Sequence, residues 1–130
     1  MRKLQSMKSL KAKAWKVFSE HIRSQNIDHL GFTNCYTCSK RIHWKQEAQA
    51  GHAIPGRTNA VLFDPEIVRP QCPRCNVWNR GMYHIFTSKL IREHEPNGLD
   101  WWEEKLRASR MPLKLSRIAL ESIISQYTPT

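Results

Sequence analysis

The sequence predicts an α+β fold, with a small cysteine-rich core between amphipathic helices at the two ends of the chain. Apolar residues recur at three- and four-residue steps over residues 3–25 and again over 113–126, which is the period of a helix with one buried face. Between these segments, short apolar runs alternate with turn residues, and two Cys-x-x-Cys pairs lie there as well. These three observations favour a core of short strands with flanking helices.

Length and charge narrow the class of protein further. A chain of 130 residues fits one domain, in which we expect a basic N-terminal helix over 1–30, a core over 31–95, and packing or dimerisation helices over 96–130. The formal net charge is +10, and seven basic against two acidic residues fall in 1–30, seven against three in 31–80, and seven against six in 81–130. This excess favours a polyanionic partner, for which nucleic acid is the default. A merely soluble basic protein is the alternative.

The sequence predicts no membrane-spanning segment, because it has no apolar run of about 18 residues. The N-terminal residues are basic but no apolar stretch follows them, so we expect no secretory signal. A reducing, cytoplasmic location follows from these expectations. In such a location, we expect paired cysteines to bind a metal and not to form disulfides.

The first helix is expected to bury one apolar stripe. Its lysines and arginines fall mostly on the other faces, where they are either solvated or able to lie along phosphates. One of these basic residues is Lys3. The stripe consists of Leu4, Met7, Leu10, Ala14, Phe18 and Ile22.

The middle of the chain reads as loops and short strands. Residues 26–34 contain loop-forming residues, whereas 42–53 have the mixed alternation of one or two short strands. The apolar run 61–63 lies between two turn sequences and predicts another strand. A further strand is expected to lead from 67–68 into the second cysteine pair.

The second half of the chain should be helical. Pro73 suits the first turn of a helix, which we expect to continue past Gly81 to about His94. Asp100 can cap a helix over 101–110, because a glutamate follows at the capping-box position.

The two cysteine pairs predict a structural zinc site. Cys35-x-x-Cys38 and Cys72-x-x-Cys75 are separated by 33 residues, and two such pairs can present four thiolates to one tetrahedral zinc ion. Because a helix is expected after the second pair, the arrangement suggests a treble-clef finger. Two disulfides and a redox-active pair are the alternatives.

Two polar residues between and after these cysteines suggest hydrolytic chemistry. His52 ends a predicted strand just before a turn, and Asn76 directly follows the fourth cysteine at the start of a helix. In a treble clef the hairpin and this helix face each other, so the two side chains are expected to converge on one point. Imidazole suits a general base, and an amide oxygen can hold Mg²⁺. The alternatives are a surface histidine and an ordinary helix-start asparagine.

Phosphodiester hydrolysis also needs a catalytic divalent metal and cationic side chains. His84 is a further histidine that can approach the site, if it lies two turns along the helix of Asn76. The residues expected to contact the DNA backbone are Lys40, Arg41, Arg57, Arg69, Arg74 and Arg80.

The ordered strings Cys-x-x-Cys, His-Trp-Lys, Gln-Ala-Gly-His, Pro-Gly-Arg, Leu-Phe-Asp and Gln-Cys-x-x-Cys-Asn resemble the NinG/Rap family of phage recombination nucleases. That family belongs to the His-Me finger (HNH-like) endonucleases, and the resemblance spans about residues 14–86. The order of cysteines, histidine and asparagine is also similar to that of the phage Holliday-junction resolvase endonuclease VII.

The resemblance implies a zinc-bound ββα-metal core that cleaves branched DNA such as Holliday junctions or D-loops. It implies His52 as general base, Asn76 as a ligand of catalytic Mg²⁺ or Mn²⁺, and the four cysteines as structural zinc ligands. It also implies a phage-infected or prophage-carrying bacterial host. Paired incisions related by symmetry would require a homodimer. A zinc finger that binds nucleic acid without cutting it, or a nuclease that has lost activity, is one alternative. A small assembly protein whose charge aids docking on a larger DNA machine is another.

The sequence departs from the family pattern at three places. Many such enzymes have a metal-binding side chain just before the general base, where this chain has Gly51. Asp64 is the best acidic candidate for the missing ligand, and Glu47 is the next. Glu66 and Met82 replace asparagines that are common in the family.

Overall fold

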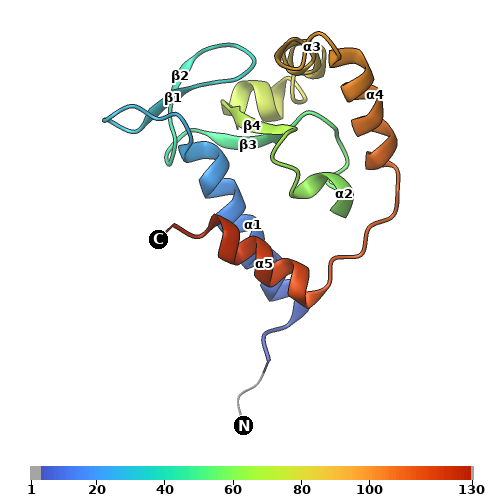
Figure 1. Ribbon diagram of the computed structural model, residues 1–130. Helices are drawn as coiled ribbons and strands as arrows, with labels where there is room; N and C mark the ends of the chain where they lie inside the picture. Colours follow the sequence, from blue (N-terminus) through green and yellow to red (C-terminus); the bar gives the residue numbers. More distant parts are fainter. Residues whose placement is uncertain (1–3, 130) are drawn as a thin grey trace.

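The computed structural model describes residues 4–129 and is a mixed α/β structure with two small antiparallel sheets (Figure 1). Residue 3, predicted to begin the first helix, lies outside the described residues. In chain order the elements are α1 (Met7–Ser24), β1 (Phe32–Asn34), β2 (Arg41–His43), β3 (Gln49–His52), α2 (Asn59–Leu62), β4 (Val68–Gln71), the π-helical turn η1 (Arg74–Trp78), α3 (Tyr83–Glu93), α4 (Gly98–Ser109) and α5 (Arg117–Tyr127).

The predicted N-terminal helix is confirmed as α1, with a later start than expected. Ser6 caps it, since the Ser6 hydroxyl accepts a hydrogen bond from the Ser9 amide at 3.1 Å. The buried stripe is shorter than predicted, because Leu4 precedes the helix and is 79% exposed, and Met7 is 41% exposed. The stripe that is buried consists of Leu10, Ala14, Phe18 and Ile22.

Two hairpin-like sheets form the middle of the chain. β1 pairs with β2, and β3 pairs with β4, both in antiparallel register. The main core lies between the β3–β4 pair, α1 and α3, where long apolar side chains exclude water. Its largest fully buried members are Phe18, Phe86, Ile22, Ile67, Leu90, Val61 and Val68.

The strand predicted over 61–63 is wrong, since these residues belong to the short helix α2 and its end. Val61 and Leu62 are both buried although they are adjacent. A strand would turn adjacent side chains to opposite faces, whereas this single helical turn buries both. A run of three apolar residues is too short to show whether its period is that of a helix or that of a strand.

The long helix predicted from Pro73 to His94 is also wrong, because the chain breaks it into η1 and α3. Arg80, Gly81 and Met82 have φ values of 51°, 87° and 52°. Three consecutive residues in the left-handed region end any right-handed helix. Glycine adopts this conformation without steric cost, which is why the break is centred on Gly81.

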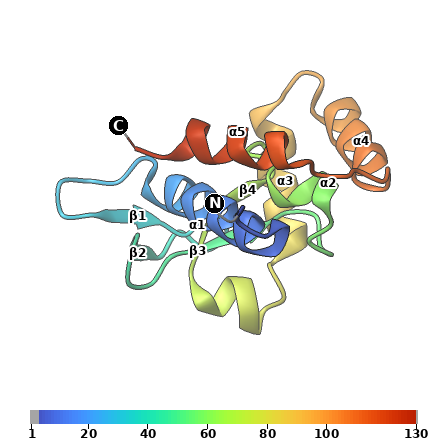
Figure 2. The ribbon, with the colours of Figure 1, turned by 90° about the horizontal axis from the view of Figure 1, so that it is seen from below.

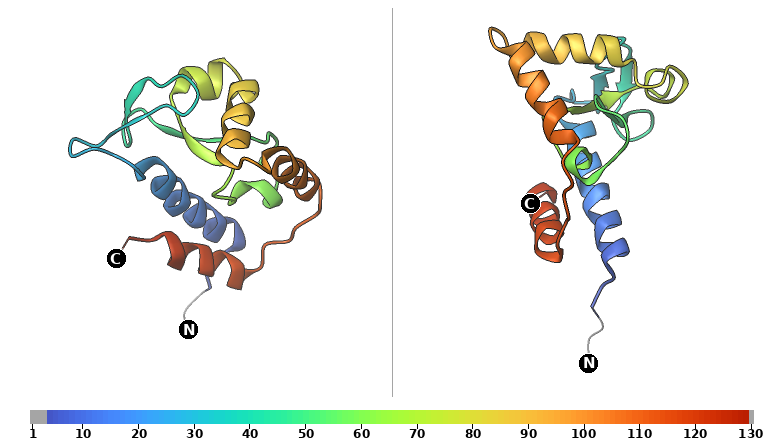
Figure 3. Two further views of the ribbon diagram at one scale, coloured as in Figure 1. Left: turned by 45° about the horizontal axis from the view of Figure 1, so that its top comes forward. Right: turned by 90° about the vertical axis from the view of Figure 1, so that its right-hand side faces the viewer.

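The last third of the chain forms the expected helices. α4 begins at Gly98, three residues before the predicted start, so Asp100 lies in its first turn and does not cap it. α5 lies along α1 (Figures 1 and 2), and Leu120 packs against Leu10 and Ala14. Burial against the N-terminal helix is therefore confirmed for α5. α3 and α4 form an angle at the other end of the molecule (Figure 3).

Within residues 4–129, none of the helices combines the length and the apolar character that crossing a bilayer would require.

Candidate functional site

The four predicted cysteines lie together and can hold a metal ion such as zinc. Their sulfur atoms all lie within 4.8 Å of one another, and those of Cys38 and Cys72 are 3.7 Å apart. Tetrahedral zinc with Zn–S bonds of about 2.3 Å places its sulfurs about 3.8 Å apart, so the cluster has the dimensions of a zinc site. All four cysteines are free, and the two disulfides considered from the sequence do not form.

Backbone hydrogen bonds bring the two cysteine pairs together. The Cys35 amide donates to the Lys40 carbonyl at 2.7 Å, which closes a tight turn around the first pair. The Tyr36 amide donates to the Pro70 carbonyl at 2.9 Å and ties this turn to β4. Cys72 directly follows β4, so the second pair begins where the first one is anchored.

The pKa values of two clustered thiols, Cys35 and Cys75, are shifted in opposite directions. Burial raises the pKa of Cys35, but hydrogen bonds from Thr37 and nearby amides outweigh it and lower that pKa to about 6. Burial, together with the neighbouring sulfurs, raises the pKa of Cys75 to about 12. Burial thus disfavours the charged form of a thiol in this cluster. A bound divalent metal favours that form, because metal ligation deprotonates thiols.

His52 lies at the end of β3 and is held in one tautomer. Its Nε2 is 3.1 Å from the carbonyl oxygen of Leu62. A carbonyl only accepts hydrogen bonds, so Nε2 carries the proton and Nδ1 carries the lone pair. Trp15 stacks on the ring, with centroids 5.5 Å apart and planes inclined by 20°. Burial lowers the pKa of His52, the Leu62 carbonyl opposes this, and the charge of Arg57 lowers it further.

Asn76 belongs to a cluster of amide side chains on the other side of the β3–β4 pair. Its Nδ2 donates to Oε1 of Gln49 at 2.7 Å. Gln71 of β4 pairs with Gln49 in the antiparallel register and shares its face of the sheet. The Oδ1 atom of Asn76 lies 3.1 Å from the position that a Cβ atom on Gly51 would take.

His52 and Asn76 lie on opposite faces of β3 and share no direct contact. Successive side chains of a strand point to opposite faces, so Gly51 faces Asn76 while His52 faces Trp15. Among residues 4–129, no hydrogen bond joins His52 to Asn76. The convergence of the two side chains on one cation therefore stays a prediction.

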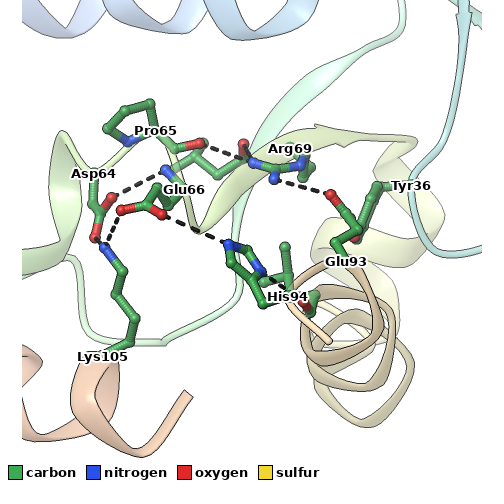
Figure 4. A network of polar contacts seen from close by, with 10 residues as sticks. Tyr36, Asp64, Pro65, Glu66, Arg69, Glu93, His94 and Lys105 are labelled. Carbon is green, nitrogen blue, oxygen red and sulfur yellow. Dashed lines mark hydrogen bonds and ion pairs between the residues drawn. The ribbon is translucent and has the colours of Figure 1, made fainter. Parts of the chain in front are cut away.

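The predicted acidic ligands are engaged elsewhere. Asp64 Oδ2 accepts a hydrogen bond from Lys105 Nζ at 2.8 Å, and Asp64 Oδ1 accepts from the Glu66 amide at 3.0 Å (Figure 4). Glu66 also pairs with Lys105, at 2.8 Å. Burial opposes the charge of Lys105, but the hydrogen bonds to Asp64 and Glu66 outweigh it and raise the pKa of Lys105. Asp64 thus already has partners on both oxygens.

Three further residues singled out from the sequence are Glu47, Met82 and His84. Glu47 Oε1 accepts a hydrogen bond from the His43 amide at 3.2 Å, which closes the loop after β2. Met82 occupies the left-handed position just before α3. His84 is exposed on α3, past the break at Gly81, and not on the helical turn that carries Asn76.

The basic residues predicted to contact DNA fall into two groups. Arg69 donates to the carbonyls of Pro65 and Val68 and pairs with Glu93, so its guanidinium is already used within the fold (Figure 4). Arg41 pairs with Asp28 at 2.8 Å.

The second group presents its charge outward. Arg74 and Arg80 are exposed on either side of η1, and Arg57 is exposed above Trp15 at 4.6 Å from the ring centroid. Lys40 is exposed and lies 4.0 Å from Glu47. Within the described part of the chain, no ion pair involves the three arginines.

Sequence reasoning missed several residues at this site. Trp15 was not among the predicted residues, yet it covers His52. Gln71 is fully buried beside Gly51, and the sequence offered only a polar residue directly before Cys72 as a signal. Trp78 is 79% exposed in η1, two residues after Asn76. An aromatic residue in a basic segment after the last cysteine was the available signal for it.

Comparison of this chain with protein-family models, with curated proteins and with solved structures found no match.

Proposed function

We propose that this protein is a zinc-stabilised, metal-dependent endonuclease that cleaves branched DNA, with β3, β4 and η1 as a treble-clef ββα-metal core of the His-Me finger type. The observation that carries the proposal is the position and the tautomer of His52. It is a histidine at a strand end with Nε2–H fixed by a carbonyl and Nδ1 left as a base. It lies in a fold that joins four clustered cysteines to an adjacent asparagine.

The chemistry proposed for His52 is general-base catalysis. A neutral imidazole is needed to take a proton from water, and the lowered pKa of His52 keeps it neutral at pH 7. The Leu62 carbonyl orients the ring and stabilises the charge that forms when Nδ1 gains a proton. These are the properties that distinguish a working base from a solvated histidine.

Asn76 is the residue proposed to hold a catalytic Mg²⁺ or Mn²⁺ through its amide oxygen. A divalent cation supplies charge stabilisation for the phosphate and the leaving oxygen when it is bound. Asn76 is partly exposed, and its Nδ2 is fixed by Gln49 so that Oδ1 is free to accept. The donor set therefore fits a hard cation, which prefers oxygen ligands.

The proposed DNA surface consists of the exposed arginines Arg57, Arg74 and Arg80 together with Trp78. Arginines bind phosphates, and an exposed indole can stack on an unpaired base of the kind that junctions and loops present. Arg57 lies next to both Trp15 and His52. A phosphate bound by Arg57 would therefore be held near the proposed base.

A second function, DNA binding without cleavage, is favoured by one specific observation. His52 is only 9% exposed, and Trp15 covers it on the face opposite Asn76. A catalytic base must reach water, whereas a binding module has no such need. In this case the cysteine cluster and the basic surface would suffice.

A cleavage assay separates the two functions. Zinc-loaded protein would be incubated with Mg²⁺ or Mn²⁺ and with linear duplex, flap or four-way-junction DNA. His52→Ala would be compared with His84→Ala, which removes an exposed histidine outside the site. Metal-dependent cutting of branched DNA that only His52→Ala abolishes supports the endonuclease. Binding by all three proteins without any cutting supports the binding module.

The proposed endonuclease is expected to act as a homodimer, because two incisions across a junction require two active sites. Light scattering after size exclusion, with and without junction DNA, measures the mass of the complex. A dimer on the junction is the expected result. A single copy on junctions that are cut in both strands would contradict paired incision.

A further inference from the structure

One buried polar atom is left without a partner near the proposed metal site. Gln71 is 0% exposed, and its Oε1 accepts no hydrogen bond. Its Nε2 donates to the Thr37 hydroxyl at 3.0 Å and to the Gly81 carbonyl at 2.9 Å. Buried acceptors are normally paired, so an orphaned amide oxygen calls for a ligand or another explanation.

The orientation of this amide is determined by its neighbours. The Gly81 carbonyl can only accept, so the Gln71 atom that faces it must be the NH₂ group. Turning the amide over would place two oxygen atoms against each other. The unpartnered oxygen therefore belongs on the side of the amide away from Gly81.

That oxygen lies where a side chain at position 51 would begin. The position of a Cβ on Gly51 is 1.9 Å from Gln71 Oε1 and 3.1 Å from Asn76 Oδ1. Any larger residue at position 51 would collide with Gln71. The absence of a side chain at Gly51 thus makes room for the Gln71 oxygen beside the Asn76 oxygen.

We propose that Gln71 is the second protein ligand of the catalytic cation, taking with Asn76 the place of the carboxylate that Gly51 cannot provide. The inference rests on the proposed function, since it concerns the metal of that site. A cation would partner the buried oxygen, and Mg²⁺ commonly uses only one or two protein ligands besides water and phosphate. Because both ligands are neutral, phosphate oxygens of DNA must supply the negative charge, and the metal binds more tightly when DNA is present.

Nuclear magnetic resonance can measure this binding directly. Mg²⁺ is titrated into the zinc-loaded full chain while the side-chain carbonyl carbons of glutamines and asparagines are followed. We expect those of Gln71 and Asn76 to shift with one shared midpoint. Asn59, whose amide is held by Lys11 and the Leu113 carbonyl, is the control that should not move.

Two substitutions separate a ligand role from a structural one. Gln71→Met and Gln71→Glu both lose the NH₂ donor to Thr37 and Gly81, but only Gln71→Glu keeps an oxygen. We expect Gln71→Met to raise the Mg²⁺ midpoint at Asn76 by about tenfold or more, and Gln71→Glu to leave it unchanged or lower it. Equal weakening in both variants would show a structural role and overturn the inference.

A double variant keeps the test decisive if either substitution unfolds the protein. Gly51→Asp with Gln71→Ala moves the ligand to position 51 and removes the collision. It should bind Mg²⁺ with an Asn76 shift at least as large as that of the wild type, and failure to bind would count against the site.

The inference and the proposed function can fail separately. Cleavage with Mg²⁺ while Gln71 shows no shift would overturn the ligand assignment and leave the nuclease intact. Joint shifts of Gln71 and Asn76 in a protein that never cuts would leave the cation site and remove the nuclease.

Discussion

Trp15 stacks on His52 with ring centroids 5.5 Å apart, so an indole from the first helix shields the imidazole at the end of β3. Arg57 lies on the indole, 4.6 Å from the Trp15 ring centroid. The three residues come from different segments and link the basic N-terminal helix to the proposed base. The proposed base is therefore covered by a residue that lies outside the zinc framework.

Removing Trp15 should return the pKa of His52 towards its ordinary value. Burial is the main cause of the lowered pKa, and Trp15→Ala would admit water to the ring. Titration of the His52 ring protons by nuclear magnetic resonance should give a pKa below 6.5 in the wild type and a higher one in Trp15→Ala. Trp15→Ala should also lower the free energy of unfolding by about 2 kcal/mol, less than for a fully buried aromatic residue. The same pKa in both proteins would contradict the shielding role.

Stability should fall in acid because of His52. The unfolded chain binds a proton at His52 below pH 6.5, whereas the folded protein resists it, so the unfolded state binds more protons in this range. His52 therefore stabilises the fold fully above pH 6.5, and this contribution is lost as the pH falls below that value. Through this one group the free energy of unfolding changes by at most about 1.4 kcal/mol per pH unit. Denaturant unfolding measured between pH 7.5 and about 5 gives the free energy of unfolding at each pH. This free energy should fall less with falling pH in His52→Gln than in the wild type. The same pH dependence of stability in both proteins would contradict this account.

Chelation of zinc should unfold the core. The cysteine cluster joins the β1–β2 turn to the segment that follows β4. Excess chelator should abolish the cooperative melting transition or lower Tm by more than about 10 °C, and added zinc should restore it. Circular dichroism measures both effects. Full helicity and an unchanged Tm in excess chelator would refute the zinc site.

Trp78 should contribute to DNA binding. Trp78→Ala should weaken the binding of junction DNA by roughly 5- to 150-fold, since stacking is worth about 1–3 kcal/mol per base. Ile118→Ala is a matched control, because both residues are 79% exposed and Ile118 lies on α5. Fluorescence anisotropy at fixed salt gives both affinities. Equal affinities for the two variants would remove Trp78 from the DNA surface.

Asp64 is expected to stabilise the fold and not to bind the metal. Asp64→Asn breaks the ion pair with Lys105 and should lower the free energy of unfolding by about 1 kcal/mol. Glu121→Gln removes an exposed carboxylate on α5 and should have no measurable effect. The Mg²⁺ concentration needed for half-maximal cleavage should be the same in both variants. A large increase for Asp64→Asn alone would restore Asp64 as a metal ligand.

The sequence alone predicts the features that depend on spacing. The intervals between the cysteines predict one site, and the four-residue steps of Leu10, Ala14, Phe18 and Ile22 predict α1. Such patterns report local geometry and need no knowledge of the rest of the chain.

Features that depend on tertiary packing were not predictable in the same way. The helix break at Gly81 requires three left-handed residues, of which only one is a glycine. The face on which His52 lies depends on strand alternation, and a shift of one residue would reverse it. The orphaned oxygen of Gln71 follows from hydrogen bonds to two segments far apart in sequence.

The central claim is that His52 acts as the general base of a DNA endonuclease. The most direct measurement is the single-turnover rate of cleavage of a four-way junction in Mg²⁺ by the wild type, His52→Ala and His84→Ala, with DNA affinity measured in parallel. We predict that His52→Ala lowers the rate by about 10²- to 10⁴-fold at unchanged affinity, whereas His84→Ala cuts at the wild-type rate. Wild-type cleavage by His52→Ala, or no cleavage by the wild type with either metal, would contradict the claim.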